Sequence, residues 1–557
     1  MLSLKEKYLL FSLLALSIFF GISSLWNIYL STTEKIPAYG KEYSEALVGE
    51  PQFINPILIS ANDVDRDISE LVYSSLLDYD KNGELTGDLA TDYKISEDGK
   101  QYTFFLRNDV FWHDGKKFTA DDVVFTVSSI INPAYSSPLR SSWQGIKIEK
   151  IDDYTVKFTL NNVYAPFLEK LTIGIIPKHI WESVDPKNII LANANLKPTG
   201  TGPFKATKLV KNSSGHIVSF YLEANDNFYK KRPYIDSIVF RFYDDEEQAI
   251  NAYQKKDVLG ISNISSKNQF LFDTKKTDIH KFNIPKYFAI FLNQNQSLIL
   301  SDKKVREALN IATDKKALIK EIFLGEASIV DSPILPNLFA YNDKLEKVEF
   351  DQKKAENILE KIGWKDKDGD GIREKTLSKG KDPVKLEITL ATSDFVDLAK
   401  AADMIKEQWM NVGVLVNIEN YGIDELKQNI IKTRKYDALI FGEVLSHDPD
   451  PFAFWHSSQK KDPGLNLSLY SNKEADKFLE EARQTLKSEE RAEKLKEFQK
   501  ILVDDTPAIF LYSPKYLYPL SKKIKGIDIK NISIPSKRFI NIENWYIKTQ
   551  RISKKSN

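Results

Sequence analysis

The stretch FWHDGKKFTADDVVF, residues 111–125, joins a tight turn to the beginning of a helix. The His-Asp-Gly tripeptide at 113–115 has the chemistry of a turn, since Gly tolerates a positive φ angle and Asp can hydrogen-bond to nearby backbone. Thr119 can cap the helix that follows, with Asp122 three residues later as a short capping-box acid. Apolar residues then recur at helical spacing and predict one buried face: Val123, Val124, Val127, Ile130 and Ile131.

Outside this stretch, short strands alternate with amphipathic helices. Residues 101–107 alternate in polarity, as a half-buried strand does, and they precede the turn at 113–115. Residues 398–412 have a helical pattern that ends at Gly413, and an apolar strand at 414–418 follows at once. This alternation predicts a mixed α/β class. The lack of a sequence repeat of about 20–50 residues argues against a solenoid or a propeller.

The composition excludes several classes of function. The chain has 557 residues, enough for roughly two to four domains, with 78 Lys and Arg against 78 Asp and Glu. This net charge of zero argues against a nucleic-acid-binding protein, because such proteins neutralise phosphates with excess basic residues. The chain has no Cys, which rules out disulfides, thiolate metal sites and a lipid-modified cysteine, and its 6 His leave few candidates for His-based catalysis. The last residues, 548–557, are polar and basic and predict a frayed tail.

Six short motifs, taken in chain order, resemble those of the family 5 bacterial extracellular solute-binding proteins, the peptide-binding components of ABC importers. Each motif is weak alone, but together they span about residues 49–545, almost the whole chain after its N-terminal apolar segment. They are Leu89-Ala90 with residues 102–107, the stretch 111–125, GTGPF at 200–204, DKKVREAL at 302–309, YDA at 436–438 and TPAIFLY at 506–512.

The resemblance implies a two-lobed α/β fold whose lobes are joined by two crossing strands and close on a ligand about a hinge. An extra subdomain is inserted in the first lobe, and the chain returns to that lobe near its C-terminus. Carried onto this sequence, lobe I takes residues 45–80, 196–285 and 514–550, the extra subdomain takes 81–195, and lobe II takes 286–513. Such a closure buries the ligand and couples its binding to a shape that a permease can sense.

The N-terminus carries a signal peptide or a signal anchor, residues 1–31. Residues 8–30 contain no charge, and as a helix they would reach about 35 Å, enough for a hydrocarbon core of about 30 Å. Lys5 and Lys7 on a very short tail favour a cytoplasmic N-terminus. A cleaved signal peptide is the alternative, but the apolar run is long and has no clear small-x-small site at its end. We therefore expect an anchor in the cell membrane, a short flexible tether at 31–44, and lobes outside the cytoplasm, in the periplasm or at the cell surface.

Residues 441–456, FGEVLSHDPDPFAFWH, carry the main candidates for ligand binding. They follow an apolar strand, and ligands bind at strand ends in α/β lobes. In peptide-binding relatives an Asp in this loop holds the ligand's α-ammonium, since a carboxylate accepts charge-assisted hydrogen bonds from that cation. This chain departs from the family pattern, which leaves the anchor open between Asp448, Asp450 and Glu443. The other interpretation is a Pro-rich surface turn with solvated acids.

Aromatic walls and polar strand ends complete the expected site. Asn293 ends an apolar strand, and Trp143 follows a polar Ser run, although a purely structural role fits each equally well. The expected ligand-binding residues are Asp448, Asp450, Glu443, Ser446, Phe452, Trp455, Asn293 and Trp143.

The sequence gives little support to a metal, a cofactor or catalysis. Residues 366–372 resemble the opening of a calcium loop, but the twelfth position is Leu377, where a bidentate Glu is needed, and a tight hairpin turn is the alternative. His447, Asp448 and His456 match no compact metal-ligand spacing. His113 stands beside acids, but no nucleophile elbow accompanies it. We therefore expect no metal and no cofactor.

These observations indicate a non-enzymatic binding protein that delivers peptides or similar solutes to an ABC importer. Its partners would be the solute and the permease subunits in the membrane, with no nucleic acid, and it would act as a monomer. A ligand-binding sensor or a chaperone-like interaction protein on the same fold is the alternative. An exported hydrolase would need a catalytic constellation that the sequence lacks. The identity and length of the ligand stay open, because one fold serves many ligands.

Overall fold

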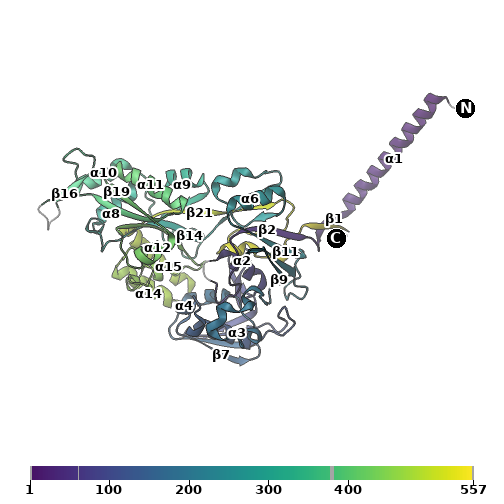
Figure 1. The fold of residues 1–557 in the computed structure, drawn as a ribbon, viewed down its shortest axis with the longest axis horizontal. Coiled ribbons are helices and arrows are strands. Elements are labelled where there is room, and N and C mark those ends of the chain that lie inside the picture. Colours follow the sequence, from purple (N-terminus) through teal and green to yellow (C-terminus); the bar gives the residue numbers. More distant parts are fainter. Residues whose placement is uncertain (1–2, 60–61, 377–381, 555–557) are drawn as a thin grey trace.

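The computed structural model describes residues 3–59, 62–376 and 382–554. Figure 1 shows two lobes side by side, a smaller subdomain packed beneath them, and a long helix that projects from one end of the body. The two-lobed α/β fold expected from the sequence is confirmed, and the N-terminal apolar segment is a helix, α1 (Leu4–Thr32).

Among the described residues, twelve strands form one sheet that runs through both lobes. Its path is β19-β18-β20-β14-β21-β12-β2-β11-β10-β9, and β13 and β15 pair with β21 beside this path. On the lobe I side lie β2 (Glu42–Val48), β9 (Phe204–Lys211), β10 (Ile217–Ala224), β11 (Ser237–Tyr243), β12 (Gly260–Ile261) and β13 (Thr277–Asn283). On the lobe II side lie β14 (Lys286–Leu292), β15 (Ala327–Ile329), β18 (Glu387–Ser393), β19 (Leu415–Tyr421) and β20 (Ala438–Val444), and β21 (Ala508–Ser521) is shared.

Two segments of chain cross between the lobes within this sheet. β21 pairs with β14 in lobe II through Ala508–Tyr512 and with β13 in lobe I through Lys515–Ser521. The other crossing segment is β13 followed at once by β14. Each segment contains a proline at the crossing, Pro285 and Pro514, and a proline supplies no backbone N–H to a ladder. These two adjacent points are therefore interruptions in the supply of N–H donors and not breaks in the sheet, because β21 continues through Pro514 and pairs there with Ala327 of β15.

Lobe II is covered by helices on both faces of its sheet, so alternate residues of β14 enter two different cores. Tyr287, Ala289 and Phe291 belong to one buried cluster, and Ile290 and Leu292 belong to the other. Burial on both faces explains why this strand reads as a continuous apolar run. The covering helices include α8 (Lys303–Ile311), α9 (Lys315–Phe323), α10 (Gln352–Lys361), α11 (Val396–Met410), α14 (Lys473–Gln484) and α15 (Ser488–Asp505).

The subdomain is an antiparallel sheet in the order β5-β6-β8-β7, covered by α3 (Ala120–Ile131). Its strands are β5 (Ala90–Ile95), β6 (Gln101–Leu106), β7 (Ile146–Asp152) and β8 (Thr155–Leu160). The predicted helix after Thr119 is present, and the Asp122 carboxylate accepts hydrogen bonds from the backbone N–H of Thr119 (3.0 Å) and of Lys178 (2.9 Å). Buried residues of the subdomain and of lobe I form one continuous core.

Two of the sequence motifs hold the subdomain to lobe I. The backbone N–H of Gly202 donates to the carbonyl of Val72 at the end of α2 (Asp63–Val72), at 2.8 Å. A Cβ at Gly200 would lie 1.8 Å from that same carbonyl oxygen, so only glycine fits. The His113 ring contacts both glycines, with Nδ1 accepting from the Gly200 N–H (3.2 Å) and Nε2 bonded to the Gly202 carbonyl (3.0 Å). His113 is therefore a structural residue.

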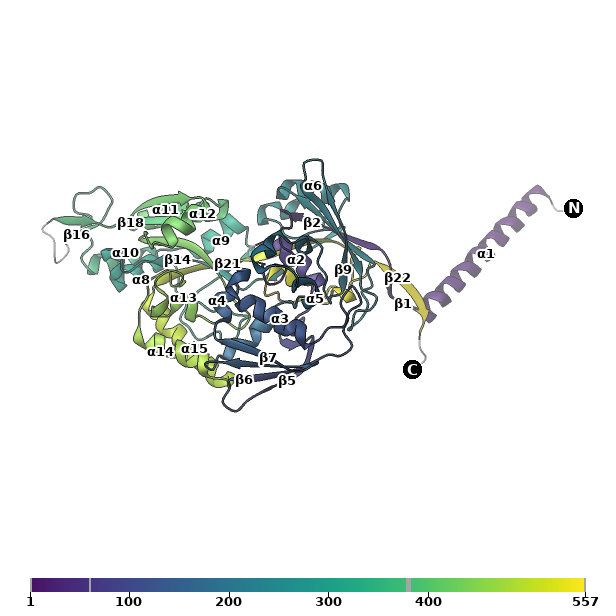
Figure 2. The ribbon, with the colours of Figure 1, turned by 60° about the horizontal axis from the view of Figure 1, so that its bottom comes forward.

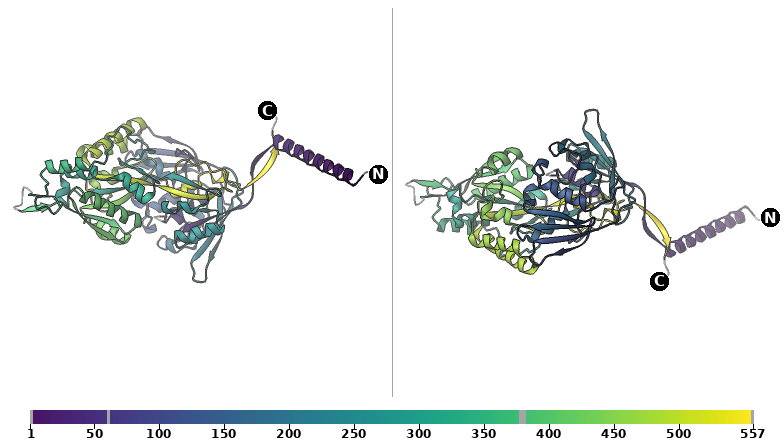
Figure 3. Two further views of the ribbon diagram at one scale, coloured as in Figure 1. Left: turned by 90° about the horizontal axis from the view of Figure 1, so that it is seen from above. Right: turned by 90° about the horizontal axis from the view of Figure 1, so that it is seen from below.

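The two ends of the chain lie together. β1 (Thr33–Ala38) pairs antiparallel with β22 (Lys548–Ser553), and this terminal ribbon connects α1 to the body (Figures 2 and 3). The sequence-based expectation of a flexible tether and a frayed tail was wrong for residues 33–38 and 548–553, because they form this paired ribbon. Their polar side chains show no periodicity, and the pairing that orders them joins segments from opposite ends of the chain. Residues 555–557 lie outside the described part of the chain.

None of the side chains of α1 is buried against the body. Within the described residues it is the one helix long and apolar enough to cross a membrane. Arg551 of β22 donates from Nη2 to the carbonyls of Leu30 and Thr33, both at 3.1 Å, and its guanidinium lies over the Tyr29 ring. The C-terminal strand thus caps the last turn of the N-terminal helix.

Candidate functional site

The interlobe loop, residues 445–456, follows β20 and lies against the subdomain. The backbone N–H of Asp448 donates to Glu169 Oε1 at 2.8 Å, and the Tyr164 hydroxyl donates to Asp450 Oδ2 at 3.1 Å. Glu169 belongs to a short helical segment of the subdomain, Ala165–Thr172, and Tyr164 directly precedes that segment. The loop predicted to hold the ligand is therefore where lobe II meets the subdomain.

Both aspartates of the loop are paired with arginines of lobe II. Arg491 Nη1 lies 2.5 Å from Asp448 Oδ2, and Arg483 binds Asp450 through Nε (2.9 Å) and Nη2 (2.7 Å). The Arg483 guanidinium also lies 3.7 Å from the centroid of the Phe452 ring. These acids are not solvated, so the interpretation as an open surface turn does not describe them. Their charge is already offset, although Asp448 Oδ1 is buried without a partner among the described residues.

Three of the expected site residues lie inside lobe II. Glu443 is buried and accepts a hydrogen bond from the Tyr287 hydroxyl, and burial raises its pKa to about 8. Trp455 packs between Phe291 and Phe510 in the core. The Asn293 amide donates to the Arg434 carbonyl at 3.1 Å, at the opposite end of β14 from the loop.

The remaining two residues are more accessible to a ligand. Ser446 is exposed, and its hydroxyl donates to the Asp448 carbonyl at 2.6 Å. Trp143 is buried against a cavity between lobe I and the subdomain, with a volume of about 530 Å³, which we call the main cavity. This volume is in the range of pockets for small molecules. The interlobe loop reaches the cavity wall through the bond from Asp448 to Glu169.

The main cavity is lined by aromatic side chains and by charges of both signs. The aromatic residues are Tyr73, Tyr79, Trp143, Phe228, Tyr229 and Phe539. The charged residues are Arg66, Glu70, Asp78, Asp88, Glu169, Lys170, Lys230, Lys537 and Glu543. Sequence reasoning found Trp143 but none of the charged residues. They are scattered over many segments, and only the tertiary fold brings them to one wall.

Some of these charges are paired within the wall. The Lys537 Nζ atom lies 2.8 Å from Glu70 Oε1 and 2.5 Å from Asp78 Oδ1. The Lys230 Nζ atom lies 2.7 Å from Asp88 Oδ1. Burial raises the pKa of Glu70 to about 7 in spite of the neighbouring ammonium of Lys537. Such pairs keep the wall polar without leaving a free charge.

Glu169 and Lys170 are different, because neither has an ion pair among the described residues. Burial raises the pKa of Glu169 to about 7 and lowers the pKa of Lys170 to about 8. The Lys170 ammonium lies over the Tyr164 ring, 5.4 Å from its centroid. An acid and a base with shifted pKa values that line one cavity without an ion pair are typical of a binding site for a charged ligand.

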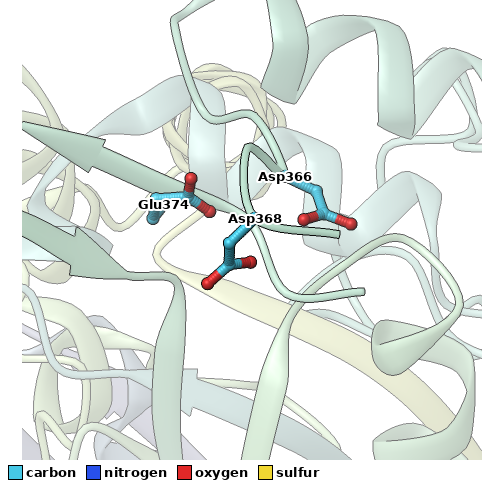
Figure 4. A group of neighbouring side chains, drawn as sticks. All are labelled: Asp366, Asp368 and Glu374. Atoms are coloured by element: carbon cyan, nitrogen blue, oxygen red, sulfur yellow. The ribbon is translucent and has the colours of Figure 1, made fainter. Parts of the chain in front are cut away.

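The calcium-like turn lies in lobe II, directly before β16 (Glu374–Thr376), which pairs with β17 (Pro383–Lys385) at the outer end of that lobe (Figure 1). Figure 4 shows the carboxylates of Asp366, Asp368 and Glu374 close together, within 4.8 Å of one another. Asp366 accepts from the backbone N–H groups of Gly369 (2.8 Å) and Gly371 (3.0 Å), as in a tight turn. Leu377 lies outside the described residues.

His447, Asp448 and His456 do not converge on a metal position. The His456 ring lies inside lobe II, with Nδ1 2.7 Å from the Ser458 hydroxyl and Nε2 3.1 Å from Glu480 Oε1. The His447 ring faces lobe I, edge-to-face with Tyr79 at 5.3 Å between centroids.

Comparisons with known proteins agree with this architecture. Residues 84–506 match the family model described as "Bacterial extracellular solute-binding proteins, family 5 Middle". The chain is 30% identical to the oligopeptide-binding protein AppA of Bacillus subtilis, over 92% of each chain, and 28% identical to a dipeptide-binding protein of Escherichia coli, over 86% of this chain and 90% of the relative.

Two solved structures illustrate the similarity in three dimensions. AppA of Bacillus subtilis in complex with a nonapeptide superposes with a TM-score of 0.73, 29% identity and coverage of 92% of this chain and 100% of that chain. NikZ of Campylobacter jejuni in complex with Ni(L-His) superposes with a TM-score of 0.74, 29% identity and coverage of 91% and 99%. The protein belongs to family 5 of the bacterial extracellular solute-binding proteins.

Proposed function

We propose that this protein captures short peptides or similar zwitterionic solutes outside the cytoplasm and delivers them, as a monomer, to the permease subunits of an ABC importer. The observation that carries the proposal is the unpaired Glu169 and Lys170 in the main cavity. The names of the peptide-binding relatives support it.

Glu169 and Lys170 suit the two charged ends of a peptide. A carboxylate can accept charge-assisted hydrogen bonds from an α-ammonium, and a lysine can donate them to a terminal carboxylate. The ammonium role first given to Asp448 or Asp450 passes in this proposal to Glu169, because each aspartate already has an arginine partner. Asp448 supports Glu169 through its backbone N–H, and Trp143 supplies an aromatic wall.

Closure about the two crossing strands would complete the site. The contacts that join the subdomain to lobe II are Tyr164 with Asp450, Glu169 with Asp448, and the backbone of Gly99 with Leu486. All of them would separate if lobe II rotated about the interruptions near Pro285 and Pro514. A ligand held by Glu169 would then favour the closed arrangement, because that residue also binds the loop of lobe II.

Attachment to the membrane would follow from α1. Its uncharged run is long enough to span a bilayer, and the absence of Cys excludes a lipid on a cysteine. The terminal ribbon would act as a short, ordered stalk above the outer membrane surface. Mass-spectrometric determination of the mature N-terminus tests this part: an intact start supports the anchor, and a start between residues 22 and 40 contradicts it.

Isothermal titration with a dipeptide, its N-acetylated form and its C-terminal amide tests the binding part. The free dipeptide should bind the full-length protein, and each blocked form should bind more weakly, because one charged end is lost. Glu169→Gln should remove the discrimination against the N-acetylated form, while Lys170→Met should remove the discrimination against the amide. Equal binding of all forms to the wild type would contradict the proposal.

A further inference from the structure

A second hollow lies behind the main cavity, beside the crossing strands. This hinge groove has a volume of about 240 Å³ and is bounded by Asn283, Pro285, Ser328, Leu338, Ser513 and Asn531, among others. It therefore touches both proline interruptions, and residues of both lobes line it. No Asp, Glu, Lys or Arg occurs among its described lining residues.

A small hollow of about 10 Å³, which we call the constriction, has lining residues in common with both the main cavity and the hinge groove. The constriction shares Tyr79 and Ile540 with the main cavity. It shares His447, Asn531 and Ile532 with the hinge groove. A volume of this size holds about one water molecule. The constriction is therefore adjacent to both larger hollows.

His447 closes the constriction from the lobe II side. Its ring packs edge-to-face on Tyr79 and directly against the backbone of Gly83, where a Cβ would lie 2.8 Å from Nε2. Burial lowers the pKa of His447, so the ring is neutral at pH 7 and carries no charge into the passage. The residue sits on the interlobe loop, next to Asp448, and moves with lobe II.

We propose that His447 limits the length of the bound ligand, and that a peptide too long for the main cavity extends past His447 into the hinge groove. This inference rests on the proposed function. The two hollows differ in chemistry: the main cavity has charges for a peptide terminus, whereas the groove suits main chain and uncharged side chains. A dipeptide would keep both charged ends in the main cavity, whereas a longer peptide would keep one charged end there and place neutral main chain in the groove.

The test compares the affinities of dialanine through hexaalanine for the full-length protein, by isothermal titration. His447→Ala should raise the affinity of the longest peptides about tenfold and change that of dialanine by less than about twofold. The exposed His216, changed in the same way, is the matched control and should leave the length profile as it is. Thermal unfolding of each variant shows whether the fold is intact.

Ser328→Trp provides a second variant with the opposite effect. Ser328 is exposed, lines the groove and not the main cavity, and a tryptophan there would fill the space. Combined with His447→Ala, it should cancel the gain for long peptides and leave dialanine unaffected. An identical length profile for the wild type and His447→Ala would overturn the inference. Failure of the proposed function gives a different result: the wild type would then bind no alanine peptide of any length. That result would overturn the proposed function and, with it, this inference.

Discussion

Two buried arginines, Arg306 of lobe II and Arg538 of lobe I, are stabilised in different ways. In lobe II, Arg306 donates to four backbone carbonyls, those of Leu300, Ser301, Asp505 and Thr506, and so fixes loops. In lobe I, Arg538 is fully buried and pairs with the side chains of Glu45 and Asp67, from distant parts of the chain. Loss of Arg306 would leave backbone carbonyls without a donor, whereas loss of Arg538 would leave two buried carboxylates without their cation. The comparison therefore teaches that the ion-paired arginine of lobe I should be the more costly of the two to remove.

The largest effect should come from breaking the buried network of lobe I. Arg538→Met leaves the Glu45 and Asp67 carboxylates buried without their cation, and should lower the free energy of unfolding by about 3–5 kcal/mol. Urea denaturation of the full-length protein measures this. Lys316→Ala is the control, since its pair with Glu349 is exposed and should contribute at most about 1 kcal/mol. Similar losses in both variants would contradict the role given to the network.

Lobe II also contains a buried acid that has no ion pair among the described residues, Glu443, and this residue predicts a pH effect. Because burial raises the pKa of Glu443 from 4.5 to about 8, the folded protein binds a proton that the unfolded chain releases between those values. Stability should therefore fall as pH rises from about 4.5 to 8, by roughly 5 kcal/mol from this group. Glu443→Gln should flatten that part of the stability curve, and an unchanged slope would show that Glu443 is ionised in the folded state.

The unpaired groups of the cavity predict the pH range of ligand binding. With a pKa of about 7 for Glu169 and about 8 for Lys170, both are charged together mainly between these values. Dipeptide affinity should peak there, and Lys170→Met should weaken it by about 2 kcal/mol and abolish the decline above pH 8. The exposed Lys187 of the same subdomain, changed to Met, is the control. A flat pH profile in the wild type would remove both residues from the site.

The smallest effect should be at the terminal ribbon. Arg551→Ala removes three hydrogen bonds to Leu30 and Thr33 at the end of α1 and should lower global stability by about 1 kcal/mol or less, since the ribbon lies outside the cores. Amide hydrogen exchange of residues 33–38 should nevertheless quicken. Unchanged protection of these amides would mean that strand pairing alone orders the ribbon.

The sequence predicted well those features that depend on local order and apolar periodicity. The helix after Thr119, the helix ending before Gly413 and the doubly buried strand β14 all follow from spacing along one segment. The pairing of β1 with β22 did not, because its partners are polar and more than 500 residues apart. Glu169 and Lys170 gave no signal either, since an acid beside a base usually indicates a solvated surface. Asp448 and Asp450 follow a recognisable apolar strand, but their arginine partners lie on α14 and α15, more than 30 residues further along the chain.

The central claim is that the main cavity holds a peptide by its charged ends. Native mass spectrometry of the full-length protein, purified without denaturation, tests it most directly by identifying what is released on unfolding. The account predicts short peptides with free termini from the wild type, and a marked loss of them from Lys170→Met but not from Lys187→Met. Release of a sugar or a metal chelate, or equal peptide content in all three proteins, would contradict it.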